Sequence, residues 1–74
     1  MPNRTLCLNY PAALLRQPIL QQLIRSFSVS VNIVRAQISL EEGWLEIDVE
    51  GDEGEIGRAQ VWLESQGIEV LQIN

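Results

Sequence analysis

The 74-residue sequence contains no histidine and no lysine, and it has a single cysteine, Cys7. One cysteine cannot form an internal disulfide, and without histidine no cluster of metal ligands can be assembled around it. The missing histidine and lysine also leave no pair of residues of the kind that activates a nucleophile. These absences predict a protein without catalytic residues, metal or other cofactor.

Long apolar segments are missing as well. No run of apolar residues approaches the ~18 that are needed to cross a bilayer, and residues 1–4 lead into an alternating pattern instead of the apolar core of a signal peptide. We therefore expect no membrane span and a cytoplasmic location. At this length the chain has room for a single domain, residues 1–74, whose core is small, so that self-association is expected to add buried surface.

Positive charge is scarce, and it is unevenly placed. The chain has five arginines against ten acidic residues, a net charge of -5, and all of its arginines except Arg58 precede the first acid, Glu41. Scattered arginines in a net negative field disfavour binding to nucleic acid. We expect instead that the two halves lie against one another, with their opposite charges on neighbouring elements.

Hydrophobic periodicity predicts four strands and two helices. Alternation with period two predicts strands over residues 5–10, 28–40, 45–51 and 68–73. An apolar stripe at helical spacing predicts a helix that opens at Pro18 and ends near Phe27. A second helix is expected between Asp52, as N-cap of a capping-box-like start with Glu55, and Gly67 as a left-handed stop.

The middle two strands are expected to form a hairpin about Glu42 and Gly43. The alternation of the first strand changes parity at Ile33 and Val34, which predicts a bulge or a change of burial partner there. One register places all the apolar residues of the hairpin on one face. It pairs Leu40 with Leu45, Ile38 with Ile47, Ala36 with Val49, and Arg35 with Glu50.

The predicted order is βαββαβ. Each helix has a single apolar stripe, so both must cover the same apolar face of one sheet. The expected fold is therefore an α+β ferredoxin-like sandwich, in which a four-stranded antiparallel sheet carries two helices on one face.

The sequence resembles the NIL domain family, which is named for an Asn-Ile-Leu motif at the second strand. The matching stretch is Val31-Asn32-Ile33-Val34, with valine in the third place of the motif. The surrounding pattern agrees along almost the whole chain. It comprises Pro18-Ile19 at the first helix, Phe27 before Val29, Gly43 and Leu45, Gly51, Trp62-Leu63, and residues 67–71.

The resemblance implies a regulatory domain that pairs as a homodimer and binds methionine, as in the domain that follows the ATPase part of methionine-importing ABC transporters. The ligand-binding residues that it implies are Asn32, Ile33, Val34 and Val31. The alternative for Asn32 is a local role, in which its amide satisfies the unusual backbone of a strand entrance or bulge. The alternative function is a ligand-free interaction module that docks onto a transporter, a ferredoxin or another larger protein through a sheet edge or Trp44.

Three other features have simpler interpretations. The carboxylates of Glu46, Asp48 and Glu50 share one face of a strand, and we expect a solvated outer face that is partly neutralised by Arg35, not a metal site. Cys7 is expected to be a small residue of the core or of the layer between sheet and helices. Trp44 is expected to be exposed, whereas Trp62 should pack.

Overall fold

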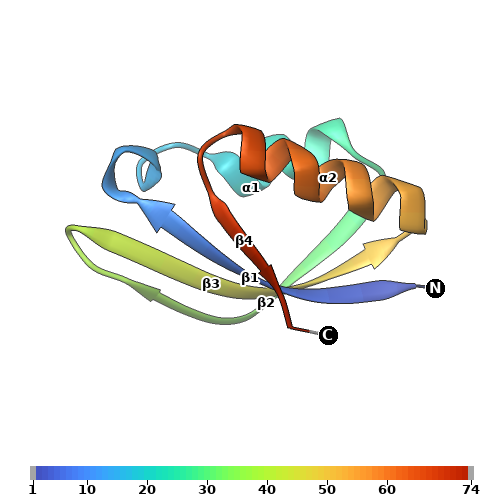
Figure 1. The fold of residues 1–74 in the computed structure, drawn as a ribbon, viewed down its shortest axis with the longest axis horizontal. Helices are drawn as coiled ribbons and strands as arrows, with labels where there is room; N and C mark the ends of the chain where they lie inside the picture. Colours follow the sequence, from blue (N-terminus) through green and yellow to red (C-terminus); the bar gives the residue numbers. More distant parts are fainter. Residues whose placement is uncertain (1, 74) are drawn as a thin grey trace.

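The computed structural model describes residues 2–73 and contains four strands and two α-helices in the order βαββαβ, with a short 3-10 turn η1 after the first strand (Figure 1). The elements are β1 (Asn3–Pro11), η1 (Ala12–Leu14), α1 (Ile19–Ser26), β2 (Val29–Ile38), β3 (Glu42–Gly51), α2 (Glu53–Ser65) and β4 (Glu69–Gln72).

The strands form one antiparallel sheet in the order β2-β3-β1-β4, so that β2 and β4 are its edges. Both helices lie on the same side of this sheet (Figure 1). The α+β ferredoxin-like fold that the periodicity predicted is therefore confirmed. Among residues 2–73, none of the helices is long and apolar enough to cross a membrane.

The core lies between the helices and the sheet, and within residues 2–73 it consists of apolar side chains and Tyr10. Even-numbered residues of β1 and odd-numbered residues of β3 face the helices, as strand alternation requires. Val29 of β2 and Ile68, which follows α2, complete the core. Its other members are Leu6, Leu8, Ile19, Leu23, Leu45, Ile47, Val49, Ile56, Ala59 and Leu63.

The register predicted for the hairpin of β2 and β3 is wrong. Ala36 pairs with Leu45 instead of Val49, and Arg35 pairs with Glu46 instead of Glu50. The chain turns earlier than expected, since the backbone N–H and the hydroxyl of Ser39 both donate to the carbonyl of Glu42, at 2.8 and 2.9 Å. The predicted register was four residues out of place, an even shift that preserves which face each side chain occupies.

The ends of α2 are capped largely as the sequence predicted. Asp52 accepts a hydrogen bond from the backbone N–H of Gly54 at 3.1 Å, which satisfies one of the donors at the helix start. At the other end Gly67 has a φ of +97°, and Ile68 donates to the carbonyl of Leu63 across a Schellman motif. The expected capping box does not form, because the Glu55 carboxylate accepts instead from the backbone N–H of Ser28, in the connection between α1 and β2.

Opposite charges from the two halves of the chain do meet on neighbouring elements. Arg4 of β1 lies 4.0 Å from Glu53 of α2 and donates to the side chain of Gln60 at 3.1 Å. Arg35 and Glu46 form the second such pair, across β2 and β3. Two of the four arginines in the first half therefore have acidic partners in the second half.

Candidate functional site

The sheet has one face without helices, here called the open face, and over β1, β3 and β2 most of its side chains are polar and lie in cross-strand rows. The pairings of β1, β3 and β2 place Thr5, Asp48 and Asn32 side by side in one such row. Neighbouring rows on a strand lie ~6.5 to 7 Å apart. The row on one side of Asn32 consists of Asn3, Glu50 and Ser30. The row on the other side consists of Cys7, Glu46 and Arg35.

A hollow of about 320 Å³ lies over two of these rows and is here called the Asn32 hollow. Its polar lining offers two carboxylates, two amides and one hydroxyl, which are groups that bind a cationic or hydrogen-bonding ligand. It is lined by Asn3, Ser30, Val31, Asn32, Asp48 and Glu50.

Asp48 is held in position beside Asn32. The hydroxyl of Thr5 donates to its Oδ1 at 2.7 Å, from the opposite neighbouring strand. This bond orients the carboxylate and uses only one of its two oxygens, so that Oδ2 remains available as an acceptor. Asp48 is half-buried, which makes its charge count for more than that of a fully solvated side chain. The arrangement suits an ammonium group better than an anion.

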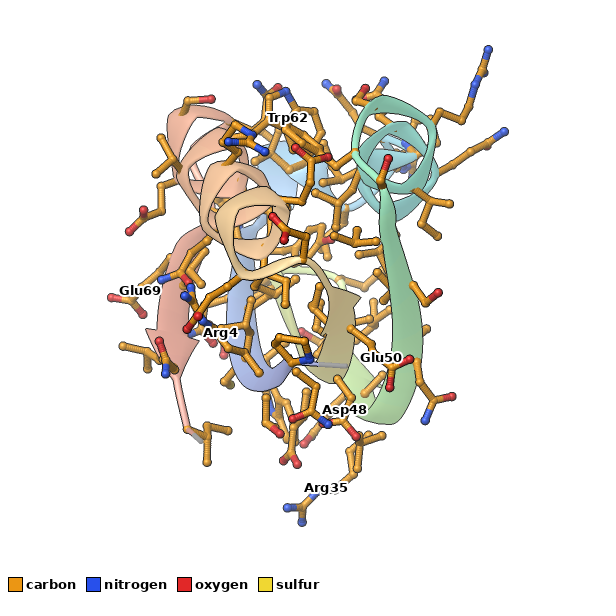
Figure 2. All side chains as sticks on the ribbon, turned by 90° about the vertical axis from the view of Figure 1, so that its right-hand side faces the viewer. Arg4, Arg35, Asp48, Glu50, Trp62 and Glu69 are labelled. Atoms are coloured by element: carbon orange, nitrogen blue, oxygen red, sulfur yellow. The ribbon has the colours of Figure 1, made fainter. Side chains whose placement is uncertain are left out.

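The next row carries the positive charge of the open face. Arg35 donates to Oε1 of Glu46 through Nε at 3.2 Å and through Nη2 at 2.9 Å. The Glu46 side chain is 16% exposed, whereas the Arg35 side chain is 69% exposed. Figure 2 shows Arg35 projecting from the side of the sheet that faces away from Trp62 and the helices. Arg35 is therefore anchored by Glu46 while most of its surface faces solvent.

A bulge in β2 separates Asn32 from Arg35. The pairing with β3 shifts between Ile33 and Arg35, at the parity change that the sequence predicted. One extra residue on β2 moves every later side chain to the opposite face. Because of this shift Arg35 shares the open face with Asn32, although an unbroken strand would place the two on opposite faces.

The residues that the resemblance implied are only partly brought together. Asn32 and Val31 line the hollow, whereas Ile33 and Val34 lie outside its lining and are 53% and 45% exposed. The strand pairing places Val31 and Ile33 on the helix side, opposite Val49 and Ile47 of the core. The hydrogen bonds found among residues 2–73 include none from the Asn32 side chain. The Asn32 amide is therefore solvent-accessible beside the hollow.

Sequence reasoning missed the other residues of the hollow. The strand pattern predicts only a solvated face for Asp48 and Glu50, and it contains no signal for Ser30 and Asn3. Strand pairing brings these four residues next to Asn32, and the incorrect predicted register of β2 against β3 did not place Asp48 beside it. Within the described part of the chain, no group of three or more Asp, Glu or Cys side chains is suited to hold a metal ion.

A second hollow of about 470 Å³ adjoins the first and is here called the Phe27 hollow. It lies where α1 passes into β2, and it shares Ser30 and Glu50 with the Asn32 hollow. Arg25 is the cationic residue of its lining. The remaining lining residues are Ile24, Ser26, Phe27, Ser28, Val29 and Gly51.

The structure also tests the expectations for the cysteine and the two tryptophans. Cys7 lies on the open face opposite Glu46 and is only half-buried, so the expectation that it belongs to the core is wrong. Trp62 packs as expected, with its ring 6.1 Å from that of Phe27. Trp44 is half-buried on the open face and not fully exposed.

Comparison with known proteins gives a family and a fold. The family model of the NIL domain matches residues 4–71. The C-terminal domain of an ABC transporter ATP-binding protein from Enterococcus faecalis has 23% identity and a TM-score of 0.86, over 96% of this chain and 83% of that one. The de novo designed protein Foldit4 has 12% identity and a TM-score of 0.58, over 99% and 98% of the two chains. The two structures agree with this chain in fold, and the search of curated protein sequences finds no match.

Proposed function

This chain belongs to the NIL domain family, a family of regulatory domains of ABC transporter ATPases, and we propose that it is a cytoplasmic, non-enzymatic regulatory domain that senses a small amino acid. Methionine is the first candidate ligand, Asn32 the central contact and a homodimer the working form. The transporter ATPase whose C-terminal domain shares this fold suggests the class of protein that it regulates.

The observation that carries this proposal is the position of Asn32. The motif residue lies in a hollow of about 320 Å³ beside Asp48 and Glu50. The carboxylates are acceptors for an α-ammonium group, and the Asn32 amide offers both a donor and an acceptor. The Asn32 amide is exposed and has no hydrogen-bond partner among residues 2–73, so its donor and acceptor groups can reach a ligand.

Apolar surface along β2 supports the homodimer. This edge strand has unpaired backbone groups on its outer side, and exposed edges of this kind are commonly covered by another chain. Ile33, Val34 and Ile38 of β2 are 53%, 45% and 64% exposed, and Ile24 of the neighbouring α1 is 48% exposed. A second copy that packs along β2 removes these side chains from water and lies next to Asn32.

Calorimetric titration of the chain with L-methionine, followed by a panel of other amino acids, tests the sensing function. We expect saturable heat and a rise in melting temperature, since a ligand specific to the folded state stabilises it by RT ln(1 + [L]/Kd). Neither heat nor a shift of melting temperature with any amino acid, at millimolar ligand, would remove amino-acid sensing from consideration.

The second candidate is an interaction module that binds no small ligand. Leu71 and Ile73 favour it, because they are 52% and 57% exposed at the opposite edge of the sheet, formed by β4. With half-buried Trp44 on the same open face, they offer apolar contacts to a larger protein. A flat response to the amino-acid panel, together with loss of binding to a transporter ATPase after Leu71→Ser, would favour this function.

A further inference from the structure

We propose that Arg35 binds the α-carboxylate of the amino acid and that Asp48, with Glu50, binds its α-ammonium group. The ligand class is thereby narrowed to zwitterionic amino acids in which both groups are free. This assignment rests on the proposed function, and it adds a specificity-determining residue outside the Asn-Ile-Val motif.

Among residues 2–73, the lining of the Asn32 hollow has no cationic side chain, so a residue outside the lining must bind the negatively charged carboxylate of the ligand. The charged groups in that lining are two carboxylates, so a ligand carboxylate placed among them would be repelled. The open face carries one arginine, Arg35, one row away from Asn32 and Asp48. The two charged groups of an α-amino acid are bonded to the same carbon, so their receptors must occupy neighbouring positions on one face.

The bulge provides that juxtaposition. Asn32 pairs with Asp48 and Arg35 pairs with Glu46, two residues further back on β3, so both side chains stand on the open face in adjacent rows. Arg35 lies three positions after Asn32, an odd spacing that in a regular strand would put the two side chains on opposite faces. The Asn-Ile-Val motif spans the bulge, and its structural effect is to bring the following arginine next to the motif asparagine.

Arg35 retains the donors that this role requires. A guanidinium has five N–H donors, and Nε and Nη2 of Arg35 both point to a single oxygen of Glu46. The remaining N–H donors of the guanidinium face solvent, since the Arg35 side chain is 69% exposed and Glu46 holds it through Nε and Nη2. Arginine forms paired hydrogen bonds to carboxylates, and an anchored guanidinium loses less conformational freedom when it does so.

Substitution of Arg35 by glutamine, combined with a ligand that lacks the carboxylate charge, tests the assignment. The titrations use L-methionine and L-methionine amide with the wild-type chain, Arg35→Gln, and the control Arg58→Gln. Arg58 is a matched control because it is 63% exposed, is paired with a glutamate and carries the same charge. Melting curves without ligand establish that each variant is folded.

We expect Arg35→Gln to weaken methionine binding at least tenfold and Arg58→Gln to leave it within twofold. L-methionine amide should bind the wild-type chain more weakly than methionine does. Arg35→Gln should not weaken the binding of L-methionine amide further. Methionine binding that is unchanged in Arg35→Gln, or equally weakened in both variants, overturns the assignment and leaves the proposed function standing. The Arg35 assignment is also overturned if methionine binding is weakened by Arg25→Gln, in the Phe27 hollow, and not by Arg35→Gln. If the wild-type chain binds no amino acid, both proposals fail.

Discussion

The backbone N–H of Ser28 donates a 2.8 Å hydrogen bond to Oε2 of Glu55, which joins the start of β2 to the first turn of α2. The other oxygen of this carboxylate accepts from Nε of Arg58 at 2.7 Å. One half-buried side chain thus connects two segments that lie 27 residues apart in the sequence. The Ser28 N–H, and then Arg58, lower the pKa of Glu55 below its usual value.

Glu55 should make the stability of the chain depend on acidic pH. Its folded-state pKa is depressed, so its contribution to stability is fully present above the ordinary pKa of 4.5 and is lost as the pH falls through the lower folded value. Melting temperatures between about pH 6 and pH 3 should therefore fall more steeply for the wild-type chain than for Glu55→Gln. Glu64→Gln, on the exposed side of the same helix, is the control and should follow the wild-type slope.

Asn32→Ala should separate ligand recognition from folding. The Asn32 side chain is exposed, so its loss should change the free energy of unfolding by no more than about 0.5 kcal/mol. Methionine binding should weaken tenfold or more, which corresponds to about 1.4 kcal/mol. Denaturant unfolding and calorimetry measure the two effects. A variant that binds its ligand as the wild-type chain does would remove Asn32 from the site.

Gly67 and Gly57 should respond in opposite directions to alanine. Gly67 has a φ of +97°, a left-handed conformation that costs a residue with a Cβ about 1 to 2 kcal/mol. A Cβ at Gly57, inside α2, would have no heavy atom within 4 Å outside its own helix backbone, so alanine there should stabilise the helix by about 0.5 to 1 kcal/mol. Urea unfolding of the two variants gives both values. Equal effects would contradict the assignment of Gly67 as the helix stop.

Tyr10 should limit stability at alkaline pH. Burial raises the pKa of this core residue to about 12 from its ordinary value of 10.0. Between these two pH values the unfolded chain loses a proton that the folded chain retains, so the free energy of unfolding falls as the pH rises, by up to about 3 kcal/mol. Tyr10→Phe should remove this slope, as followed by denaturant unfolding at several pH values. A slope that persists in the variant would assign it to another group.

Ile38→Lys should disrupt the proposed homodimer. Its side chain is 64% exposed on β2, and an added charge on this edge opposes the approach of a second copy. Sedimentation at micromolar concentration should show the wild-type chain at about twice its 8.4 kDa and the variant as a monomer. Val61→Lys on α2, where the side chain is 65% exposed, is the control and should remain dimeric. A wild-type chain that sediments as a monomer would rule out the dimer at this concentration.

The sequence by itself determined the order of elements, the helix stripes, the Asp52 and Gly67 caps and the phase change in β2, because each depends on residues close together in the chain. Tertiary structure decided the register of β2 against β3, since an even shift leaves every apolar residue on its original face and periodicity cannot detect it. Only that register places Asp48 beside Asn32 and Arg35 beside Glu46. The hydrogen bond of Glu55 to Ser28, instead of to its own helix start, was likewise decided by the tertiary structure, which brings the residues before β2 to the first turn of α2. The candidate site consists of cross-strand neighbours, and the hydrophobic pattern along one segment of the chain does not predict which residues of another segment lie beside it.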